Sequence, residues 1–175
     1  MSDRLALTDC LNTIEQKVKN RVVVVPGGGL FADQVRNIQK QWQFDDEIAH
    51  QMALLAMQQM ALLFKSIKPD FFLANKVSAI DNKCSAVIWS PDIKELISIP
   101  ASWDVTSDSL AAWLAGQLQA TELILVKSAA IPADKTIQQM QKQALVDGAF
   151  AETVKNANYK ITLLNKHSFN GHTFA

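Results

Sequence analysis

Three segments of the chain carry residue types that suit the handling of phosphate, and the first of them is a run of glycines. Gly27, Gly28 and Gly29 are consecutive, whereas the whole chain has only six glycines. Backbone N–H groups without neighbouring side chains can approach an anion closely, and the helix predicted to follow would point its positive end at the same place. A turn that needs a positive φ angle would also explain one or two of these glycines. The glycine run is therefore consistent with an anion site and with a structural turn.

The second segment, residues 102–109, is rich in hydroxyl and carboxylate side chains. Asp104, Thr106 or Ser107 could each cap the helix predicted to follow, which is the usual role of such residues at this position. They cannot all cap one helix. The surplus groups, above all Asp108 and one hydroxyl, would be available to orient a cation or to bind a phosphate oxygen.

The third segment is Lys127-Ser128, which follows a predicted strand over residues 122–126. Taken alone, such a lysine is more often a solvated charge. Together with the glycines and Asp108 it supplies what phosphoryl transfer asks of a protein, namely positioning and neutralisation of charge on phosphate oxygens. Nucleophilic triads are disfavoured, because Cys10 and His50 fall within predicted helices and the other histidines lie near the C-terminus.

These segments must be positioned by strands and helices that alternate along the chain. The valines at 22–25 indicate a buried strand, and Asp45-Asp46-Glu47 suits the start of a long helix that ends before Pro69. In parallel sheets ligands bind beyond the carboxyl ends of strands, where the glycines and Lys127 fall. We expect one α/β domain over residues 1–175, a three-layer α/β/α sandwich with a mostly parallel sheet and a loose tail at 167–175. The expected helices cover residues 3–19, 30–38, 45–66, 77–82 and 104–118, and residues 133–156 are expected to form a helical hairpin or one long helix. The other strands cover 71–74, 85–89, 122–126 and 159–164. In the first helix the residues expected to face the core are Leu5, Leu7, Leu11, Ile14 and Val18.

Composition limits the partners and the compartment. The 17 basic and 17 acidic residues cancel, which argues against a nucleic-acid partner. No apolar run is long enough to span a membrane, and the N-terminus does not read as a secretory signal. Cys10 and Cys84 stand apart without metal-ligand spacing, so we expect reduced thiols, no protein-made metal site and a cytoplasmic protein.

A predicted helix that is apolar on more than one side, with Met52, Met57 and Met60, indicates either a second subunit or a deep core position.

Residues 22–36 and 103–115 resemble the amino acid kinase superfamily, which includes acetylglutamate, aspartate, uridylate and isopentenyl phosphate kinases. The resemblance covers most of residues 20–165. It is nearest to the branch that phosphorylates an aminomethylfuran phosphate in methanofuran synthesis. It implies an α/β/α sandwich, a homodimer, a small phosphate or carboxylate acceptor, and ATP with Mg²⁺ as the phosphoryl donor.

The resemblance also implies roles for individual residues. Gly27, Gly28 and Gly29 match the loop that holds the acceptor, and Asp108 matches the aspartate that organises the catalytic lysines, with Ser107 beside it. Asp104 and Ser107 are further candidates for substrate binding.

Lys127-Ser128 departs from the family, because many members have a Thr-Asp pair near the nucleotide at this place. We therefore expect Lys127 and Ser128 to contact ATP, with Lys127 also acting in catalysis.

Family members open with a strand that ends in Lys-x-Gly-Gly-Ser, whereas the given chain begins with Met1-Ser2-Asp3. We expect a start drawn too late, a vacant or substituted sheet neighbour for residues 22–25, and weak or absent kinase activity of this exact chain. The leading hypothesis is an ATP-dependent phosphotransferase acting on a small phosphate monoester. The alternatives are a catalytically silent binding or dimeric interaction module of the same fold, and a kinase of an amino acid carboxylate.

Overall fold

The computed structural model describes residues 3–17, 21–80, 86–131 and 136–172, which form two compact units. The middle unit lies within residues 18–103, and the outer unit combines residues 3–17 with the chain from 104 onward. Every strand pair among the described residues is parallel, as predicted for an α/β fold. The five strands found in these ranges are divided between two sheets, one in each unit.

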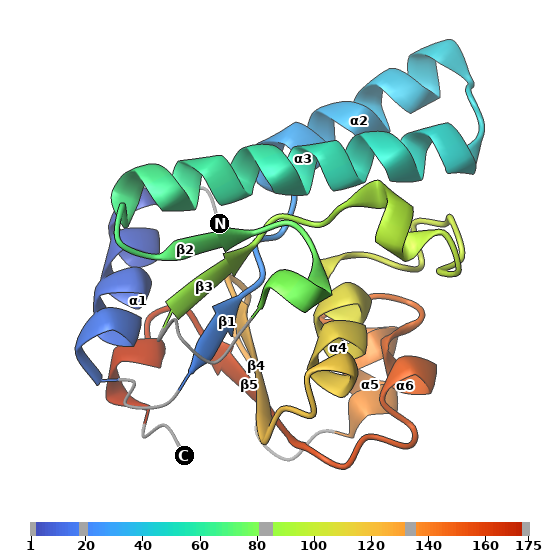
Figure 1. Cartoon of the computed structure of the whole chain (residues 1–175). Coiled ribbons are helices and arrows are strands. Elements are labelled where there is room, and N and C mark those ends of the chain that lie inside the picture. The colour runs from blue at the N-terminus through green and yellow to red at the C-terminus, as the bar shows by residue number, and fades with distance from the viewer. Residues whose placement is uncertain (1–2, 18–20, 81–85, 132–135, 173–175) are drawn as a thin grey trace. The chain divides into compact units, whose positions relative to one another are not determined.

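The middle unit is a three-stranded parallel sheet covered on one face by the helix over residues 46–67, against which the helix over residues 29–42 packs (Figure 1). The strand order is β1-β3-β2, so β3 is central, and Val87, Ile88 and Trp89 within it are fully buried. An unbroken apolar run is what a central parallel strand requires. The elements are β1 (Val22–Val24), α2 (Gly29–Trp42), α3 (Asp46–Ile67), β2 (Phe72–Ala74), the 3-10 turn η1 (Val77–Ala79), β3 (Ala86–Trp89) and η2 (Ile93–Leu96).

Helix α3 begins and ends where its sequence indicates. The Asp45 carboxylate accepts a hydrogen bond from the N–H of Ile48 at 2.8 Å, and two acidic residues follow in the first turn. These negative charges suit the positive end of the helix. At the other end, Lys65 Nζ donates to the carbonyl groups of Pro69 and Phe71, which fixes the turn into β2.

The outer unit is built on the two-stranded parallel sheet β4-β5, in register from Glu122↔Lys160 to Lys127↔Asn165. Helix α4 packs against β4 and α6. Residues 133–156, expected as a helical hairpin or one long helix, have two short helices among their described residues, separated by a loop at 143–149. The elements are α1 (Arg4–Lys17), α4 (Ser107–Gln117), β4 (Glu122–Lys127), α5 (Ile137–Lys142), α6 (Phe150–Thr153), β5 (Lys160–Asn165) and η3 (Phe169–Gly171).

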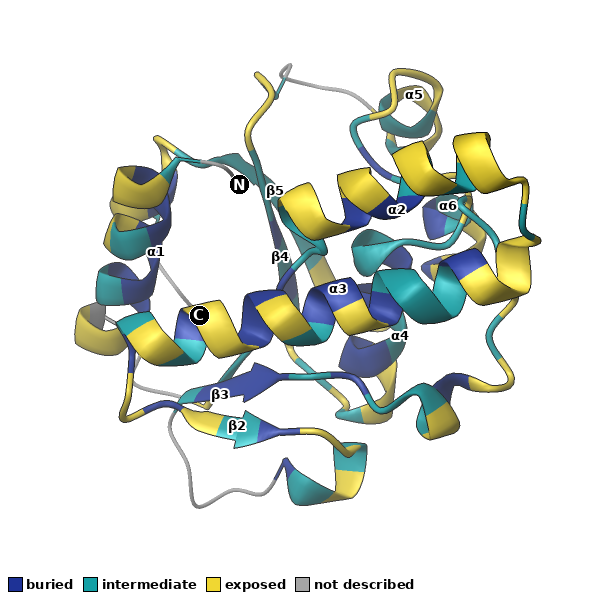
Figure 2. Cartoon of the chain, turned by 90° about the horizontal axis from the view of Figure 1, so that it is seen from above, coloured by how far each residue is buried: buried dark blue, intermediate teal, exposed yellow. Residues whose placement is uncertain are grey.

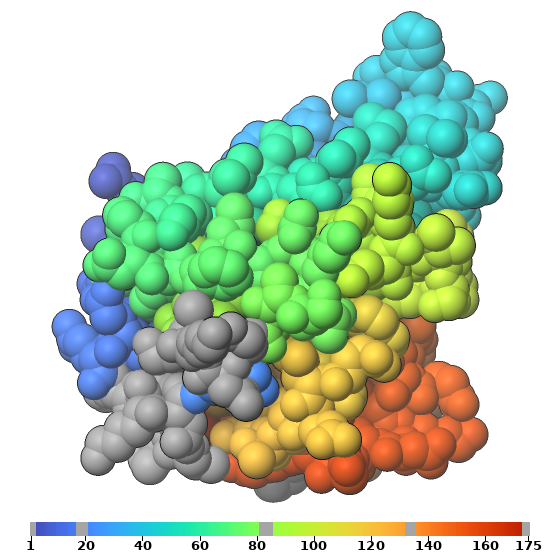
Figure 3. Space-filling view, in the orientation of Figure 1, coloured from blue at the N-terminus to red at the C-terminus, as the bar shows by residue number. Residues whose placement is uncertain are grey.

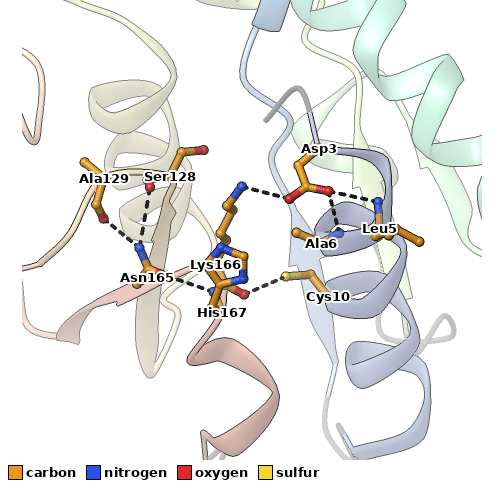
Figure 4. Close-up of polar contacts among 9 residues, drawn as sticks. All are labelled: Asp3, Leu5, Ala6, Cys10, Ser128, Ala129, Asn165, Lys166 and His167. Carbon is orange, nitrogen blue, oxygen red and sulfur yellow. Dashed lines mark hydrogen bonds and ion pairs between the residues drawn. The ribbon is translucent and has the colours of Figure 1, made fainter.

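Helix α1 is fastened to the end of β5 by polar contacts (Figure 4). The Asp3 carboxylate caps α1 through the N–H groups of Leu5 and Ala6 and also pairs with Lys166 Nζ at 2.9 Å. Further along α1, the Cys10 thiol donates to the backbone carbonyl of Lys166. Burial raises the pKa of the Cys10 thiol to about 11, so this cysteine is a neutral part of the packing.

Two expectations for the ends of the chain are wrong. Leu5, expected to face the core, is 76% exposed, while Leu7, Leu11 and Ile14 are buried as predicted. The tail is not loose as far as residue 172, because η3 packs against α1 and Phe169 is only 3% exposed. Val18, Cys84 and residues 173–175 lie outside the described residues, so the expectations for them are untested.

No helix among residues 3–17, 21–80, 86–131 and 136–172 has the length and apolar character needed to cross a membrane.

The packing of Phe169 predicts that the C-terminal segment stabilises the outer unit. Phe169→Ala should lower the free energy of unfolding by about 3 kcal/mol, because it removes a buried aromatic ring and leaves a cavity. Ile97→Ala is the control, since Ile97 is 81% exposed and its truncation should change stability by less than about 0.5 kcal/mol. Urea unfolding measures both, and equal effects of the two variants would show that Phe169 is not part of the core.

Candidate functional site

The glycine run occupies the turn between β1 and α2, as predicted, and two of its members have structural reasons to be glycine. Gly29 has φ +54°, the left-handed region that other residues rarely adopt. A Cβ on Gly28 would lie 2.5 Å from Cβ of Ala32, which leaves no room for a side chain. Gly28 is also the N-cap of α2 and offers no side-chain acceptor to the first turn of that helix.

The outer unit brings together the two residues predicted to be catalytic. Lys127 is the last residue of β4, Asp108 is the second residue of α4, and Lys127 Nζ lies 2.5 Å from Asp108 Oδ2. The Asp108 and Lys127 side chains are 14% and 21% exposed, respectively. The packing of α4 on β4 therefore creates a largely buried ion pair in which the lysine keeps some access to solvent.

The electrostatics of Asp108 are dominated by its removal from water. Burial raises the pKa of the Asp108 carboxyl above its ordinary value, even though Lys127 acts in the opposite direction. The negative charge of Asp147 also raises this pKa, whereas the Asp147 backbone N–H, which donates to Asp108, lowers it. Lys127 thus offsets part of the effect of burial on the Asp108 pKa.

The first turn of α4 is capped by a residue distant in sequence. The N-cap Thr106 makes no capping bond with its own side chain. Instead Asp147 Oδ2 accepts from the N–H and hydroxyl of Thr106, at 2.7 and 2.9 Å, and from the N–H of Ser109 at 3.0 Å. Asp147 Oδ1 accepts from the Ser109 hydroxyl. The hydroxyls of Thr106 and Ser109 are therefore engaged within the protein.

The other predicted site residues have more ordinary surroundings. Asp104 packs against the loop after α5, where a Cβ on Gly148 would lie 2.6 Å from Asp104 Oδ1 and where the Asp104 carbonyl accepts from Ala149 N–H. Ser107 begins α4 and is partly exposed, and Ser128 is exposed just beyond β4.

The predicted residues fall into two sets. Asp104, Ser107, Asp108, Lys127 and Ser128 belong to the outer unit. Gly27, Gly28 and Gly29 belong to the middle unit, so the predicted convergence of the glycines with Asp108 stays a prediction.

Asp147 is the residue that the sequence analysis did not single out. It falls within residues 133–156, expected as a helical hairpin or one long helix, and it lies in the loop between α5 and α6. The dipeptide Asp147-Gly148 is a recognised turn signal that could have marked this loop. Nothing local indicates that its partners are Thr106 and Ser109, 41 and 38 residues earlier.

Within the residues that the structure describes, no group of three or more His, Cys, Asp or Glu side chains is arranged to hold a metal ion.

Comparison with known proteins gives related kinases. The chain is 27% identical over 127 residues to a (5-(aminomethyl)furan-3-yl)methyl phosphate kinase of Methanocaldococcus jannaschii. This match covers 70% of the chain but 59% of the relative, so the alignment leaves out about two fifths of that protein. No family model matches the chain.

Solved structures of uridylate kinases share the fold. The enzyme of Archaeoglobus fulgidus superposes with a TM-score of 0.68 at 17% identity, covering 98% of this chain and 91% of that one. The UMP kinase of Ureaplasma parvum gives a TM-score of 0.71 at 18% identity, with coverage of 96% and 83%. The predicted resemblance to the amino acid kinase superfamily and the α/β fold are confirmed.

The dependence of Asp108 on Lys127 predicts a pH-dependent stability defect. Lys127→Met should raise the pKa of Asp108 further, because the charged carboxylate loses its partner. A group whose pKa is raised in the folded state contributes stability below its unfolded pKa and loses it as the pH rises through the folded value. Lys127→Met should therefore lower the free energy of unfolding more at pH 8 than at pH 4.5. The difference should be about 1.4 kcal/mol for each tenfold rise in the proton affinity of the Asp108 carboxyl.

Urea unfolding at the two pH values measures this defect. The double variant Lys127→Met, Asp108→Asn is the control, and it should recover much of the loss at pH 8 because no uncompensated charge remains. A penalty that is equal at both pH values, or that the double variant does not relieve, would contradict the dependence.

Proposed function

We propose that the protein is an ATP-dependent phosphotransferase that acts on a small phosphate monoester, with an aminomethylfuran phosphate as the specific acceptor. The observation that carries this proposal is the Lys127 ammonium held against Asp108 at the carboxyl end of β4. Homology to a kinase named for an aminomethylfuran phosphate supports both the reaction class and the acceptor.

Lys127 would neutralise the phosphoryl group during transfer. An ammonium has three donors, so one can remain on Asp108 while the others bind phosphate oxygens. An oxygen of the acceptor phosphate forms the new bond to the γ-phosphorus of ATP, and the bond to the β-phosphate oxygen breaks to release ADP. Positioning and charge neutralisation are the main contributions that this reaction needs from the protein.

The remaining predicted residues would hold the two substrates. The backbone N–H groups around Gly27, Gly28 and Gly29 would bind the acceptor phosphate at the uncapped start of α2. Ser128 would lie near the nucleotide, and Ser107 near the acceptor. Mg²⁺ would enter bound to ATP, where it neutralises charge on the phosphates.

Two other functions have some support. A carboxylate acceptor would need the same donor machinery and differ only in what the glycine turn holds. A silent binding module would keep the fold and bind a small molecule without turnover. The acceptor experiment below separates these functions.

We also propose that two copies of the chain associate through the outer faces of α2 and α3. One face of α3 is buried in the core, as a deep core position requires, and it includes Leu54, Met57 and Met60.

The opposite side of α3 carries an apolar stripe, in which three exposed residues recur every seven positions: Ile48, Leu55 and Leu62. Figure 2 shows exposed residues along both helices, and Figure 3 shows the side chains of α3 at the molecular surface. A stripe of this kind is self-complementary in a two-fold dimer and would otherwise leave apolar surface in water.

Kinase activity should depend on Lys127 and Asp108. With ATP and an aminomethylfuran phosphate, Lys127→Met should lower kcat about 100-fold, because it removes the cation that meets the transition state, and Asp108→Asn should lower kcat with little loss of stability. The matched control is Lys155→Met, since Lys155 is an exposed lysine in the same unit and pairs only at the surface with Glu152. Coupled measurement of ADP release, with identification of the phosphorylated product, gives the rates.

The choice of acceptor decides among the three functions. ADP release that requires a phosphate monoester supports the proposal, whereas release that requires glutamate or aspartate would reassign the protein as a carboxylate kinase. A folded protein that binds ATP but releases no ADP with any acceptor, both as the given chain and as a chain extended upstream, would be the silent module.

The dimer proposal predicts a mass of two chains in solution. Light scattering after size exclusion should give this value for the wild-type protein and the mass of one chain for Leu55→Asp, Leu62→Asp, because buried charges oppose association. Ile97→Asp, on a more exposed residue outside α2 and α3, is the control and should stay dimeric. A wild-type monomer at micromolar concentration would refute the dimer.

A further inference from the structure

The strongest unassigned feature is the Asp147 carboxylate, which lies between two parts of the outer unit that are far apart in sequence. Its two oxygens accept four hydrogen bonds from the backbone and hydroxyl groups of Thr106 and Ser109. By comparison, the ordinary N-cap Asp45 accepts one hydrogen bond, from a residue three positions later. Asp147 therefore does more than terminate a helix.

The two residues that Asp147 contacts flank Asp108 in the sequence. Because the Asp147 carboxylate holds both Thr106 and Ser109, it also holds the first turn of α4, which carries Asp108. A backbone hydrogen bond from Asp147 is also among the causes that lower the pKa of Asp108. The loop that carries Asp147 thus holds Asp108 through the first turn of α4.

The next two residues of the loop continue this arrangement. The N–H of Ala149 donates to the carbonyl of Asp104 at 2.7 Å, and Gly148 lies so close to the Asp104 carboxylate that any larger residue would collide with it. Residues 147–149 therefore hold the whole segment from Asp104 to Ser109 in one position relative to the loop.

Asp147 also determines where a phosphate group can bind. A helix N-terminus attracts anions, but at α4 this place is taken by a carboxylate of the protein, which would repel a phosphate. An anionic substrate is thereby directed to Lys127, which is partly exposed.

We infer that Asp147 is a positioning residue that holds Asp108 against Lys127 for phosphoryl transfer. This inference rests on the function proposed above. Asp147 does not contact the reacting groups in this role. It keeps the carboxylate that orients the lysine in one place, and it keeps the start of α4 closed to phosphate.

A thermodynamic cycle in the ligand-free full chain tests the positioning directly. The Asp108 carboxyl is titrated by carbon NMR, with Asp108→Asn to identify its resonance, before and after Lys127→Met. In the wild-type background the lysine substitution should raise the Asp108 pKa, because the pair is in contact. In the Asp147→Ala background this change should largely disappear, because the two groups are no longer held together.

The control is Asp45→Ala, which removes a helix cap from the middle unit without touching Asp108. In that background the effect of Lys127→Met should be unchanged. Should Asp147→Ala not fold, Asp147→Asn removes the charge and keeps an acceptor, and Ser109→Ala and Thr106→Val each remove one hydroxyl donor. Each of these three should give a partial loss of the coupling.

Turnover provides the second measurement. Asp147→Ala should lower kcat at least tenfold and change KM for ATP less than threefold, whereas Asp45→Ala should leave both values near those of the wild type. Coupling that persists in every Asp147, Ser109 and Thr106 variant overturns the inference, whatever the turnover. Coupling that is lost in a protein without kinase activity would support the positioning and refute the proposed function.

Discussion

The outer unit depends on one constraint, which is that the Asp108 carboxylate and the Lys127 ammonium are held together while both are largely removed from water. Desolvation of two charges is costly, and apolar residues in the same places would often stabilise a protein as well or better. Such a pair therefore contributes little as a stabilising device, but it makes a rigidly placed cation available at the end of a strand. The capping of α4 by Asp147 serves the same constraint, since it keeps the carboxylate from moving away from its partner.

Local signals in the sequence predicted the elements and much of the outer site. The acidic start at Asp45 and the stop before Pro69 defined α3, and consecutive valines defined β1. The strand predicted over residues 122–126 placed Lys127 at its carboxyl end, where β4 has it, and the surplus of capping residues singled out Asp108. Their contact follows from helix α4 packing back on β4, as short connections in α/β folds require.

What the sequence could not give are contacts over long separations. Asp147 caps a helix that begins 40 residues earlier, and Phe169 packs against the first helix of the chain, so neither partner leaves a periodic pattern nearby. Leu5 was assigned to the core because its spacing fits a helical face, but helix α1 turns that face only partly inward. The sequence predicted the position of the glycine run but could not decide its role. The conformation of Gly29 and the packing of Gly28 both require glycine for structural reasons, and an anion would bind the same backbone.

A crystal structure with a non-hydrolysable ATP analogue and an aminomethylfuran phosphate tests the role of the ion pair most directly. The expected result is Lys127 Nζ within about 3 Å of a γ-phosphate oxygen, still bonded to Asp108, with the acceptor phosphate on the backbone of Gly27, Gly28 and Gly29. A nucleotide whose phosphates lie elsewhere, while Lys127 and Asp108 remain paired, would contradict the assignment of this lysine to phosphoryl transfer.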